Sequence, residues 1–450
     1  LIVKSYSATE ARNVRTDVLK KGVFRVIFLQ QFTAAKGAMI FTGSGFVNPH
    51  AGSGQNNLYR CFLDLGFRIG SEGGVISYIH QDGHLTEPSA NVFRSACYHR
   101  LKKRFHFRNQ LTQKLFSEIG HRVEFSLNIY RATPDVIEFD NMTQMFQASQ
   151  VDESYSHDGA GTVPAIKNEA GSWDTRGHRN RIVKITSESL TTIREVSDDE
   201  STPADQAKFI SPFSSDLLFT FDTFSQVVKW REGFSNFQIS PMWHESAAQK
   251  ELKAIRREVN FPANSHDVIL SAPNIYVANP TYQSVGRHAR SHGDYLPIDL
   301  TLIGGKFVPR TIFKPNNDQN SFDLYNPKST IHGSLHHSDF FRLALRRRTG
   351  PHGERTLIGA IIPPGWAHVH ALLSISFASN TELINAACIS SSIPLDFLIK
   401  ASGRGDIITS TVKSFPYVQL PNTALSRMLR LNAVTASFAE LWGEIYPELD

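Results

Sequence analysis

The feature that most constrains the fold is an alternation of helix and strand patterns between residues 57 and 132. Asn57 suits a helix N-cap, and the helix after it repeats apolar residues at helical spacing, at Leu58, Phe62, Leu65 and Ile69. "VISYIH" (75–80) predicts a buried strand, and residues 89–105 predict a second helix with a basic end. Residues 121–132 alternate apolar and polar side chains, which predicts a half-buried strand. This series is typical of a three-layer α/β domain.

The next segment has a different composition. Residues 136–211 are polar and rich in Ser, Asp, Gly and Thr, which predicts an insertion or linker that is partly disordered. We therefore divide the chain into an α/β part (1–135), this linker, and a second domain (212–450).

The second domain combines helical and strand patterns. Helices are predicted at the start of the domain and over 243–259, 380–401 and 423–442, and short strands over 268–315. Residues 340–349 and 355–365 flank the turn Gly350-Pro351-His352-Gly353, a pattern that predicts a β-hairpin.

The composition indicates a folded protein. Hydrophobic residues make up 41% of the 450 residues and charged residues 20%, which is typical of a globular chain. We find no apolar run long enough to cross a bilayer and no signal peptide, so we expect no membrane partner. Cys61, Cys97 and Cys388 form no CxxC pair, which argues against a disulfide framework and fits a reducing cytoplasm. The chain begins with Leu, and we expect it to be part of a longer protein.

The positive charge is clustered. The net charge is +5 and the pI about 9.0, which on its own only modestly favours a nucleic-acid partner. Residues 99–114 and 342–355 interleave Lys and Arg with apolar residues. Such a run can equally be a solvated surface.

Two short motifs resemble parts of a methyltransferase active site. "FTGSGF" (41–46) has the glycine spacing of an S-adenosylmethionine loop, but no long strand precedes it and no helix begins directly after it, so we interpret it as a connecting loop. Asn279-Pro280-Thr281-Tyr282 resembles the (D/N/S)PP(Y/F/W) tetrapeptide that holds a flipped adenine. Thr281 replaces the second proline, and we interpret the match as coincidence.

Histidines are the obvious candidates for metal ligands. Zinc needs three or four converging ligands, usually with Cys or carboxylate among them. The spacings do not suggest such convergence, so no metal site is predicted among His80, His84, His332, His336, His337, His368 and His370.

Residues 56–132 nevertheless resemble a known family, the large adenine-specific (N6) DNA methyltransferases of fused restriction–modification systems and of the BREX and DISARM phage-defence systems. The resemblance lies in the segment that follows the catalytic tetrapeptide of that family. The matching positions are Asn57-Leu58-Tyr59, Phe62-Leu63, Gly73-Gly74, Phe105-His106-Phe107-Arg108-Asn109, Leu115-Phe116 and Phe125 to Tyr130.

A second block also resembles the family. "DFFRLALRRRTGPHGERTLIGAIIPPG" (339–365) and "SSIPLDFLIKASGRGDIITSTVKSFPYVQLP" (391–421) are similar to its target-recognition region. The two blocks cover roughly half the chain in the family's order. They imply the rear half of a Rossmann-like methyltransferase sheet, followed by a mixed α+β target-recognition domain.

The departures from the family concern catalysis. The cofactor loop and the tetrapeptide normally precede the first block, and nothing before Asn57 supplies either. We therefore assign no catalytic, cofactor-binding or metal-binding residue in this chain, although the resemblance implies S-adenosylmethionine for the complete enzyme. A missing N-terminal methyltransferase segment, or another subunit of the defence system, is the implied partner.

Double-stranded DNA is the other implied partner. Arginine suits this role because its guanidinium group can contact phosphates or guanine edges with two hydrogen bonds. On a strand, Arg346 and Arg348 would share one face and Arg347 the other. The candidate DNA-binding residues are Arg342, Arg346, Arg347, Arg348 and Arg355, with Lys102, Lys103 and Arg104 as weaker candidates for contact with the DNA backbone. Pairing with acidic neighbours such as Glu354 is the alternative role for the arginines.

Three hypotheses remain at this point. The chain is part of an adenine methyltransferase whose catalytic half is elsewhere, a non-catalytic DNA-specificity module that recruits an enzyme, or an unrelated α/β protein with a basic surface.

Overall fold

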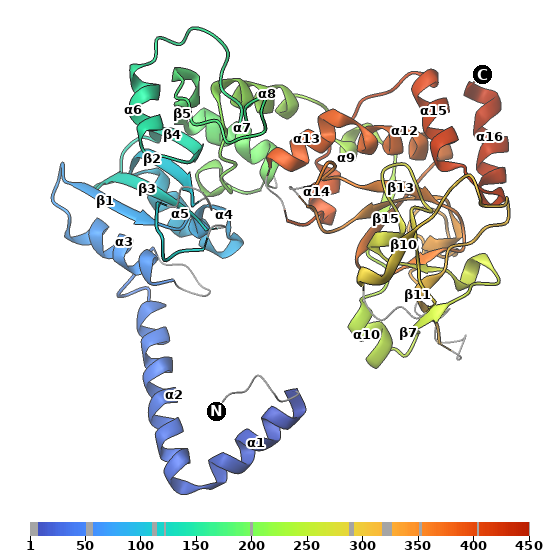
Figure 1. The fold of residues 1–450 in the computed structure, drawn as a ribbon, viewed down its shortest axis with the longest axis horizontal. Helices are drawn as coiled ribbons and strands as arrows, with labels where there is room; N and C mark the ends of the chain where they lie inside the picture. The colour runs from blue at the N-terminus through green and yellow to red at the C-terminus, as the bar shows by residue number, and fades with distance from the viewer. Residues whose placement is uncertain are drawn as a thin grey trace. The chain divides into compact units, whose positions relative to one another are not determined.

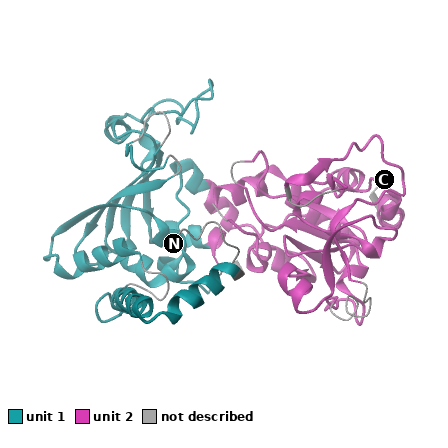
Figure 2. Ribbon diagram, turned by 60° about the horizontal axis from the view of Figure 1, so that its bottom comes forward, with its two compact units in different colours: residues 1–194, 200–219 teal, residues 195–199, 220–450 magenta. Residues whose placement is uncertain are grey.

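The chain forms two compact units. The computed structural model describes residues 8–50, 57–109, 115–120, 123–198, 201–287, 292–316, 326–350, 353–402 and 405–449 (Figure 1). Unit 1 comprises residues 1–194 and 200–219, and unit 2 comprises residues 195–199 and 220–450 (Figure 2). Two of the boundaries between the units fall inside helices α7 (Ser187–Ser197) and α8 (Ser215–Ser225). Both units combine helices with β-sheet, so the predicted α/β class is confirmed.

Unit 1 is built on a five-stranded mixed sheet with the strand order β1-β3-β2-β4-β5. Strand β3 runs antiparallel to β1 and β2, and β4 runs parallel to β2. The strands are β1 (Val75–His80), β2 (Leu101–Arg108), β3 (Glu124–Arg131), β4 (Glu138–Met145) and β5 (Val183–Thr186). The remaining helices are α1 (Ala8–Lys20), α2 (Gly22–Thr42), α3 (Leu58–Ile69), α4 (Gly83–Thr86), α5 (Asn91–Tyr98) and α6 (Ser149–Ser156).

Helices cover both faces of this sheet (Figure 1). On one face, Phe105 and Phe107 pack in a cluster with Tyr155 of α6. On the other, Tyr98 of α5 stacks on Phe139, and Phe67 of α3 packs edge-on against Tyr130 of β3. Unit 1 therefore has the three layers expected from the sequence.

Several expectations for unit 1 are corrected. The helix predicted over 89–105 ends at Tyr98, and the basic residues after it lie on β2, because Phe105 and Phe107 alternate into the sheet core. The segment 136–211, predicted to be a partly disordered insertion or linker, contains β4, α6, β5 and α7. Its polarity is misleading because polar side chains are buried with partners; Gln150 Oε1, for instance, accepts a 2.7 Å hydrogen bond from Phe146 N.

Strand β1 is an open edge of the sheet. Among the described residues it pairs with β3 alone, and its outward side chains Val75 and Ile79 are 72% and 55% exposed, so it is not the buried strand predicted. Helix α3 turns Leu63 and Phe67 inward. The apolar residues picked out by the sequence face outward instead, at Leu58, Phe62, Leu65 and Ile69. No side chain of α2 is buried, although the helix is largely apolar.

Unit 2 contains two four-stranded sheets, in the orders β13-β12-β15-β6 and β14-β8-β11-β7, and a two-stranded ribbon β9-β10. The strands are β6 (Phe237–Ser240), β7 (Ile255–Asn260), β8 (Ile269–Leu270), β9 (Gln283–Val285), β10 (Tyr295–Pro297), β11 (Thr311–Pro315), β12 (Arg342–Arg346), β13 (Gly359–Ile362), β14 (Ala367–His368) and β15 (Leu372–Phe377). The helices are α9 (Trp230–Gly233), α10 (Glu245–Lys250), α12 (Asn380–Ser391), α13 (Ile393–Ala401), α14 (Thr409–Lys413), α15 (Asn422–Asn432) and α16 (Ala439–Leu449).

The layers of unit 2 pack around β12. The two sheets share a buried cluster that includes Leu270, Ala344, Ile362 and Trp366. Helices α12, α15 and α16 lie on the far side of the first sheet (Figure 1). Strand β12 is buried on both faces along most of its length, so its residues reach the surface at its end.

The predicted hairpin is confirmed, because Leu343 pairs antiparallel with Ile361; its turn residues Pro351 and His352 lie outside the described residues. The helix predicted over 243–259 is partly wrong. It stops at Lys250, Lys253 adopts a left-handed φ of 51°, and β7 follows. The segment predicted as one helix over 380–401 forms two helices, α12 and α13. The segment predicted as one helix over 423–442 forms most of α15 and the start of α16.

No single helix among the described residues is long and apolar enough to cross a bilayer. Helices α12 and α13 meet that length and composition only as a pair bent by 57°, and most of α12 is buried inside unit 2.

Candidate nucleic-acid interface

Three consecutive arginines lie at the C-terminal end of β12. We call Arg346, Arg347 and Arg348 the arginine cluster. The backbone around them is fixed by pairing on both sides. Arg346 N donates to Ile358 O at 2.8 Å, and Arg347 N donates to Ala371 O at 3.0 Å. Beyond β12 the chain pairs with a segment near residue 406, where Ile407 N donates to Arg347 O at 2.7 Å. The arginines are therefore presented from a rigid strand end.

Asp406 is the carboxylate that faces this cluster. Its Oδ1 lies 3.2 Å from Arg348 Nε, and its Oδ2 lies 3.7 Å from Arg347 Nη2. Neither contact has hydrogen-bond alignment, so both are electrostatic. The Arg348 side chain is 84% exposed. Among the described residues this carboxylate, and not Glu354, balances part of the cluster's charge.

Arg347 also contacts an imidazole. Its Nη1 lies 2.8 Å from His370 Nδ1, and the His370 ring lies 5.3 Å from that of His244. Burial, with the positive charge of Arg347 second, lowers the pKa of His370. A neutral His370 can accept a hydrogen bond from the guanidinium group, which fixes the direction of Arg347. Arg347 and Arg348 thus lie near one another, unlike the alternation expected for a regular strand.

Arg346 is held against aromatic side chains. Its Nη2 donates to Ile275 O at 2.6 Å, and its guanidinium carbon lies 5.8 Å from the ring centre of Tyr276. Tyr276 stacks on Tyr282 with ring centres 4.8 Å apart. Burial lowers the pKa of Arg346. The tyrosine pair, Tyr276 and Tyr282, thus adjoins the arginine cluster.

Arg342 has a different environment at the other end of β12. The residue is 0% exposed, its Nε donates to Phe340 O at 3.1 Å, and its Nη2 donates to Trp366 O. Burial lowers its pKa to about 9. Arg342 is not accessible to DNA, so our proposal does not include it as a DNA contact.

Arg355 is partly occupied by structural contacts. Its Nη2 donates to Ser391 O at 2.8 Å, and its Nε lies 3.4 Å from Asp396 Oδ1. The same carboxylate oxygen accepts from Thr356 N and Leu357 N. Arg355 therefore ties the strand that returns from the hairpin to the start of α13.

The lysines of β2 lie in unit 1 and contact neighbouring side chains. Lys103 Nζ donates to Tyr155 OH at 3.1 Å and lies over that ring. Lys102 Nζ lies 3.9 Å from Asp135, and burial lowers its pKa. Both remain accessible in part, whereas Arg104 is buried.

Arg104 belongs to a buried polar network that the sequence analysis did not find. Its Nη2 donates to Asp82 Oδ2 at 2.6 Å, and its Nη1 donates to Asn141 Oδ1 at 2.6 Å. Ser126 Oγ also donates to Asp82. Arg104 is the main favourable partner that holds the pKa of Asp82 down to about 2 against its burial. The opposite charges of Arg104 and Asp82 neutralise each other, which suits a structural role in unit 1.

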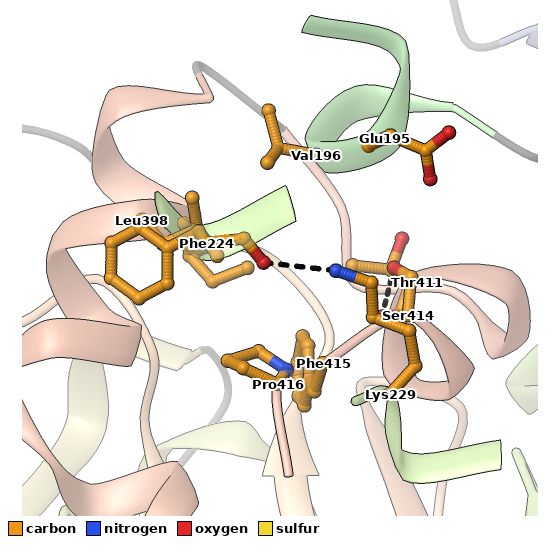
Figure 3. A pocket seen from close by; sticks show the side chains of 10 residues that line it. Glu195, Val196, Phe224, Lys229, Leu398, Thr411, Ser414, Phe415 and Pro416 are labelled. Carbon is orange, nitrogen blue, oxygen red and sulfur yellow. Dashed lines mark hydrogen bonds between the residues drawn. The ribbon is translucent and has the colours of Figure 1, made fainter. Parts of the chain in front are cut away.

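Described residues of unit 2 also line a groove and a small cavity. A polar groove of about 910 Å³ lies beside the segment that leads into β12. The residues that line it include Arg256, Lys314 and His266. Glu258 lies beside both cations and offsets part of their charge. A second cavity, of about 10 Å³, surrounds Lys229, whose Nζ donates to Phe224 O at 3.0 Å (Figure 3). It has room for at most one water molecule.

The loop "FTGSGF" does not have the local structure of an S-adenosylmethionine loop. Phe41 and Thr42 end α2, so "FTGSGF" follows a helix and not a strand. Gly43 has a right-handed backbone conformation (φ −85°). The strand, glycine turn and helix that present free N–H groups to such a ligand are not assembled there. No group of three or more His, Cys, Asp or Glu among the described residues is placed to hold a metal ion.

Comparison with known proteins found similarity in solved structures alone. No family model and no curated protein matches the chain. The type IIG restriction endonuclease BpuSI is 12% identical, with 88% of this chain and 50% of that chain covered and a TM-score of 0.30. A nuclease-deletion mutant of the type ISP restriction–modification enzyme LlaGI, in complex with a DNA substrate mimic, is 9% identical, with 86% and 32% covered and a TM-score of 0.34.

Both neighbours are restriction–modification enzymes, and the chain spans half or less of their length. At these TM-scores the similarity does not establish a shared fold.

Proposed function

We propose that this chain is the DNA-recognition part of an adenine-specific DNA methyltransferase that acts in restriction–modification or phage defence. Unit 2 contains the target-recognition region of the proposal, within residues 212–450, and residues 1–135 supply the rear of the methyltransferase sheet. The observation that carries the proposal is the arginine cluster at the end of β12, where Arg347 and Arg348 share one carboxylate, Asp406, within ion-pair distance among the described residues.

Charge and exposure support duplex DNA as the ligand. Arg348 is exposed, and Arg347 is aimed by His370, so both can reach phosphates or guanine edges. The Arg348 side of the contact with Asp406 is exposed, and such surface ion pairs contribute about 0 to 1 kcal/mol, so a phosphate can compete with Asp406 for Arg348. The bidentate geometry of a guanidinium group suits phosphate oxygens better than the misaligned carboxylate.

The open edge of unit 1 supports a missing catalytic half. Strand β1 has unpaired backbone groups on its outer side within the described residues, and its neighbours Phe62 and Ile69 are exposed apolar side chains. Proteins rarely leave such an edge uncovered, because it pairs with other chains. We assign this surface to the cofactor-binding half of the sheet, supplied by another segment or subunit. A module that only recruits an enzyme would need no such edge.

In this proposal, methyl transfer requires both this chain and the missing cofactor-binding half. N6-methylation needs the adenine to leave the base stack, which costs a few kcal/mol, and to enter a pocket beside S-adenosylmethionine. This chain grips and orients the duplex while the other half holds the cofactor.

DNA binding by the intact chain tests the proposal. Fluorescence anisotropy with a labelled duplex should give a Kd about ten-fold weaker for Arg348→Ala than for wild type, because one phosphate contact is lost. Arg427→Ala, which removes an exposed arginine of α15, is the matched control and should bind within two-fold of wild type. Equal weakening by both variants, or no binding, would contradict the proposal.

Cofactor binding is tested separately. Equilibrium dialysis with labelled S-adenosylmethionine should detect no binding to this chain by itself, whereas stoichiometric binding would show that the cofactor site lies within it.

A further inference from the structure

The tyrosine pair lies on a tightly braced loop between β8 and β9. Tyr276 N donates to Asn279 O at 2.8 Å, and Asn279 N donates back to Tyr276 O at 3.2 Å, which closes a two-residue turn. Ala278 in this turn has a φ of 53°, a left-handed conformation that is uncommon for a residue with a Cβ. Such strained positions concentrate at functional sites.

The surrounding contacts hold this turn in place. Ala278 N donates to Gly359 O of β13 at 2.8 Å, and Asn279 Oδ1 accepts from Thr281 N at 3.0 Å. Tyr282 N donates to Asn274 O at 2.9 Å, and the Asn274 side chain is itself buried and bonded to Gln283 O. The backbone that carries the two rings is therefore held in place by hydrogen bonds.

The rings combine partial exposure with a neighbouring cation. Both tyrosines are half-buried, and their two rings cover one face of each other. Arg346 adjoins Tyr276 on one side of the loop and continues into Arg347 and Arg348. Aromatic rings beside arginines are the combination with which proteins hold unpaired bases, the rings by stacking and the cations by backbone contact.

We infer that the tyrosine pair is a stacking site for an unpaired nucleobase of DNA, next to the phosphate contacts of the arginine cluster. The inference rests on the proposed function and adds a ligand that a regular duplex does not offer. A base inside a duplex is covered on both faces by its neighbours, so it cannot stack on a tyrosine. A bulged base has a face to offer, and the site should therefore prefer DNA that contains one.

Two labelled duplexes test the inference, one fully paired and one identical except for a single bulged adenine. Wild type should bind the bulged duplex about ten-fold more tightly, within the range for stacking one base on an aromatic ring. Tyr282→Leu should abolish this preference while its affinity for the paired duplex stays within two-fold. Tyr282→Phe should retain the preference, because the hydroxyl is not needed for stacking.

The outcomes separate the two proposals. Equal wild-type affinity for both duplexes, or an undiminished preference in Tyr282→Leu, overturns the stacking site. If paired DNA is still bound in an Arg348-dependent way, the proposed function stands. If neither duplex is bound, both proposals fail. Circular dichroism melting of each variant detects misfolding, and if Tyr282→Leu is unfolded, Tyr276→Leu serves as the second test.

Discussion

Neutralising Asp406 should strengthen DNA binding, which is the opposite of what a structural role for this residue predicts. Its carboxylate oxygens lie 3.2 Å and 3.7 Å from Arg348 and Arg347. DNA must displace both contacts before phosphates can occupy the guanidinium groups. Asp406→Asn removes the charge and keeps the shape of the side chain.

The magnitude follows from the exposure of these groups. Two unit charges at this distance attract by about 1 kcal/mol in water and about 4 kcal/mol at an effective dielectric constant of 20. The exposed Arg348 lies near the lower value. We expect about 1 to 2 kcal/mol in total, so that Asp406→Asn binds duplex DNA roughly five- to thirty-fold more tightly.

The variant should fold normally, because the segment is held by backbone bonds from Ile407 N to Arg347 O and from Thr349 N to Gly405 O. Anisotropy titrations at fixed salt measure the effect. Glu354→Gln, which removes an exposed carboxylate from the same hairpin, is the matched control and should stay within two-fold of wild type. Weaker binding by Asp406→Asn, or equal strengthening by both variants, would refute the reasoning.

Three further predictions concern stability and association. Burial lowers the pKa of His368 to about 3, so below pH 6.5 the unfolded chain takes up a proton that the folded chain excludes. Between pH 6.5 and 5 this should cost about 2 kcal/mol in urea unfolding, and His368→Gln should lose that part of the pH dependence; an unchanged dependence would count against it. Arg104→Met should destabilise unit 1 by about 3 to 5 kcal/mol, because it leaves Asp82 charged and buried, and adding Asp82→Asn should recover much of the loss in thermal melts. In sedimentation experiments Phe62→Glu with Ile69→Glu should reduce self-association without lowering the melting temperature, since both side chains are exposed; a large drop in melting temperature would show that the surface is buried.

Local patterns predicted the elements whose signals are local. Strand β1 and the β12–β13 hairpin lie where alternation and turn residues placed them. Strands β2 and β7 were missed because basic, weakly alternating segments resemble helices until their sheet partners are known. The sequence predicted the apolar stripe of α3, but this stripe faces outward. The spacing of apolar residues predicts a helix and does not determine which of its faces is buried.

The candidate interface was predicted only in part. The sequence marked Arg346 to Arg348 because they lie in a basic run that resembles a target-recognition region. The partners Asp406, His370 and Tyr276 lie tens of residues away, and sheet pairing alone brings them to the strand end. Arg342 shows the converse, because a basic residue of the same run is buried by the sheet around it. The sequence singled out Tyr282 only as part of the tetrapeptide match. Its stacking on Tyr276, on which the proposed base-stacking site depends, is created by the turn between them.

The salt dependence of duplex binding tests the central claim most directly. Each phosphate neutralised adds about 0.9 to the slope of log K against log salt concentration. If Arg347 and Arg348 grip the backbone, the slope of the Arg347→Ala/Arg348→Ala variant should be smaller than that of wild type by about 1.8. Parallel lines for the two proteins would contradict the account, because the arginine cluster would then contribute no contact to DNA.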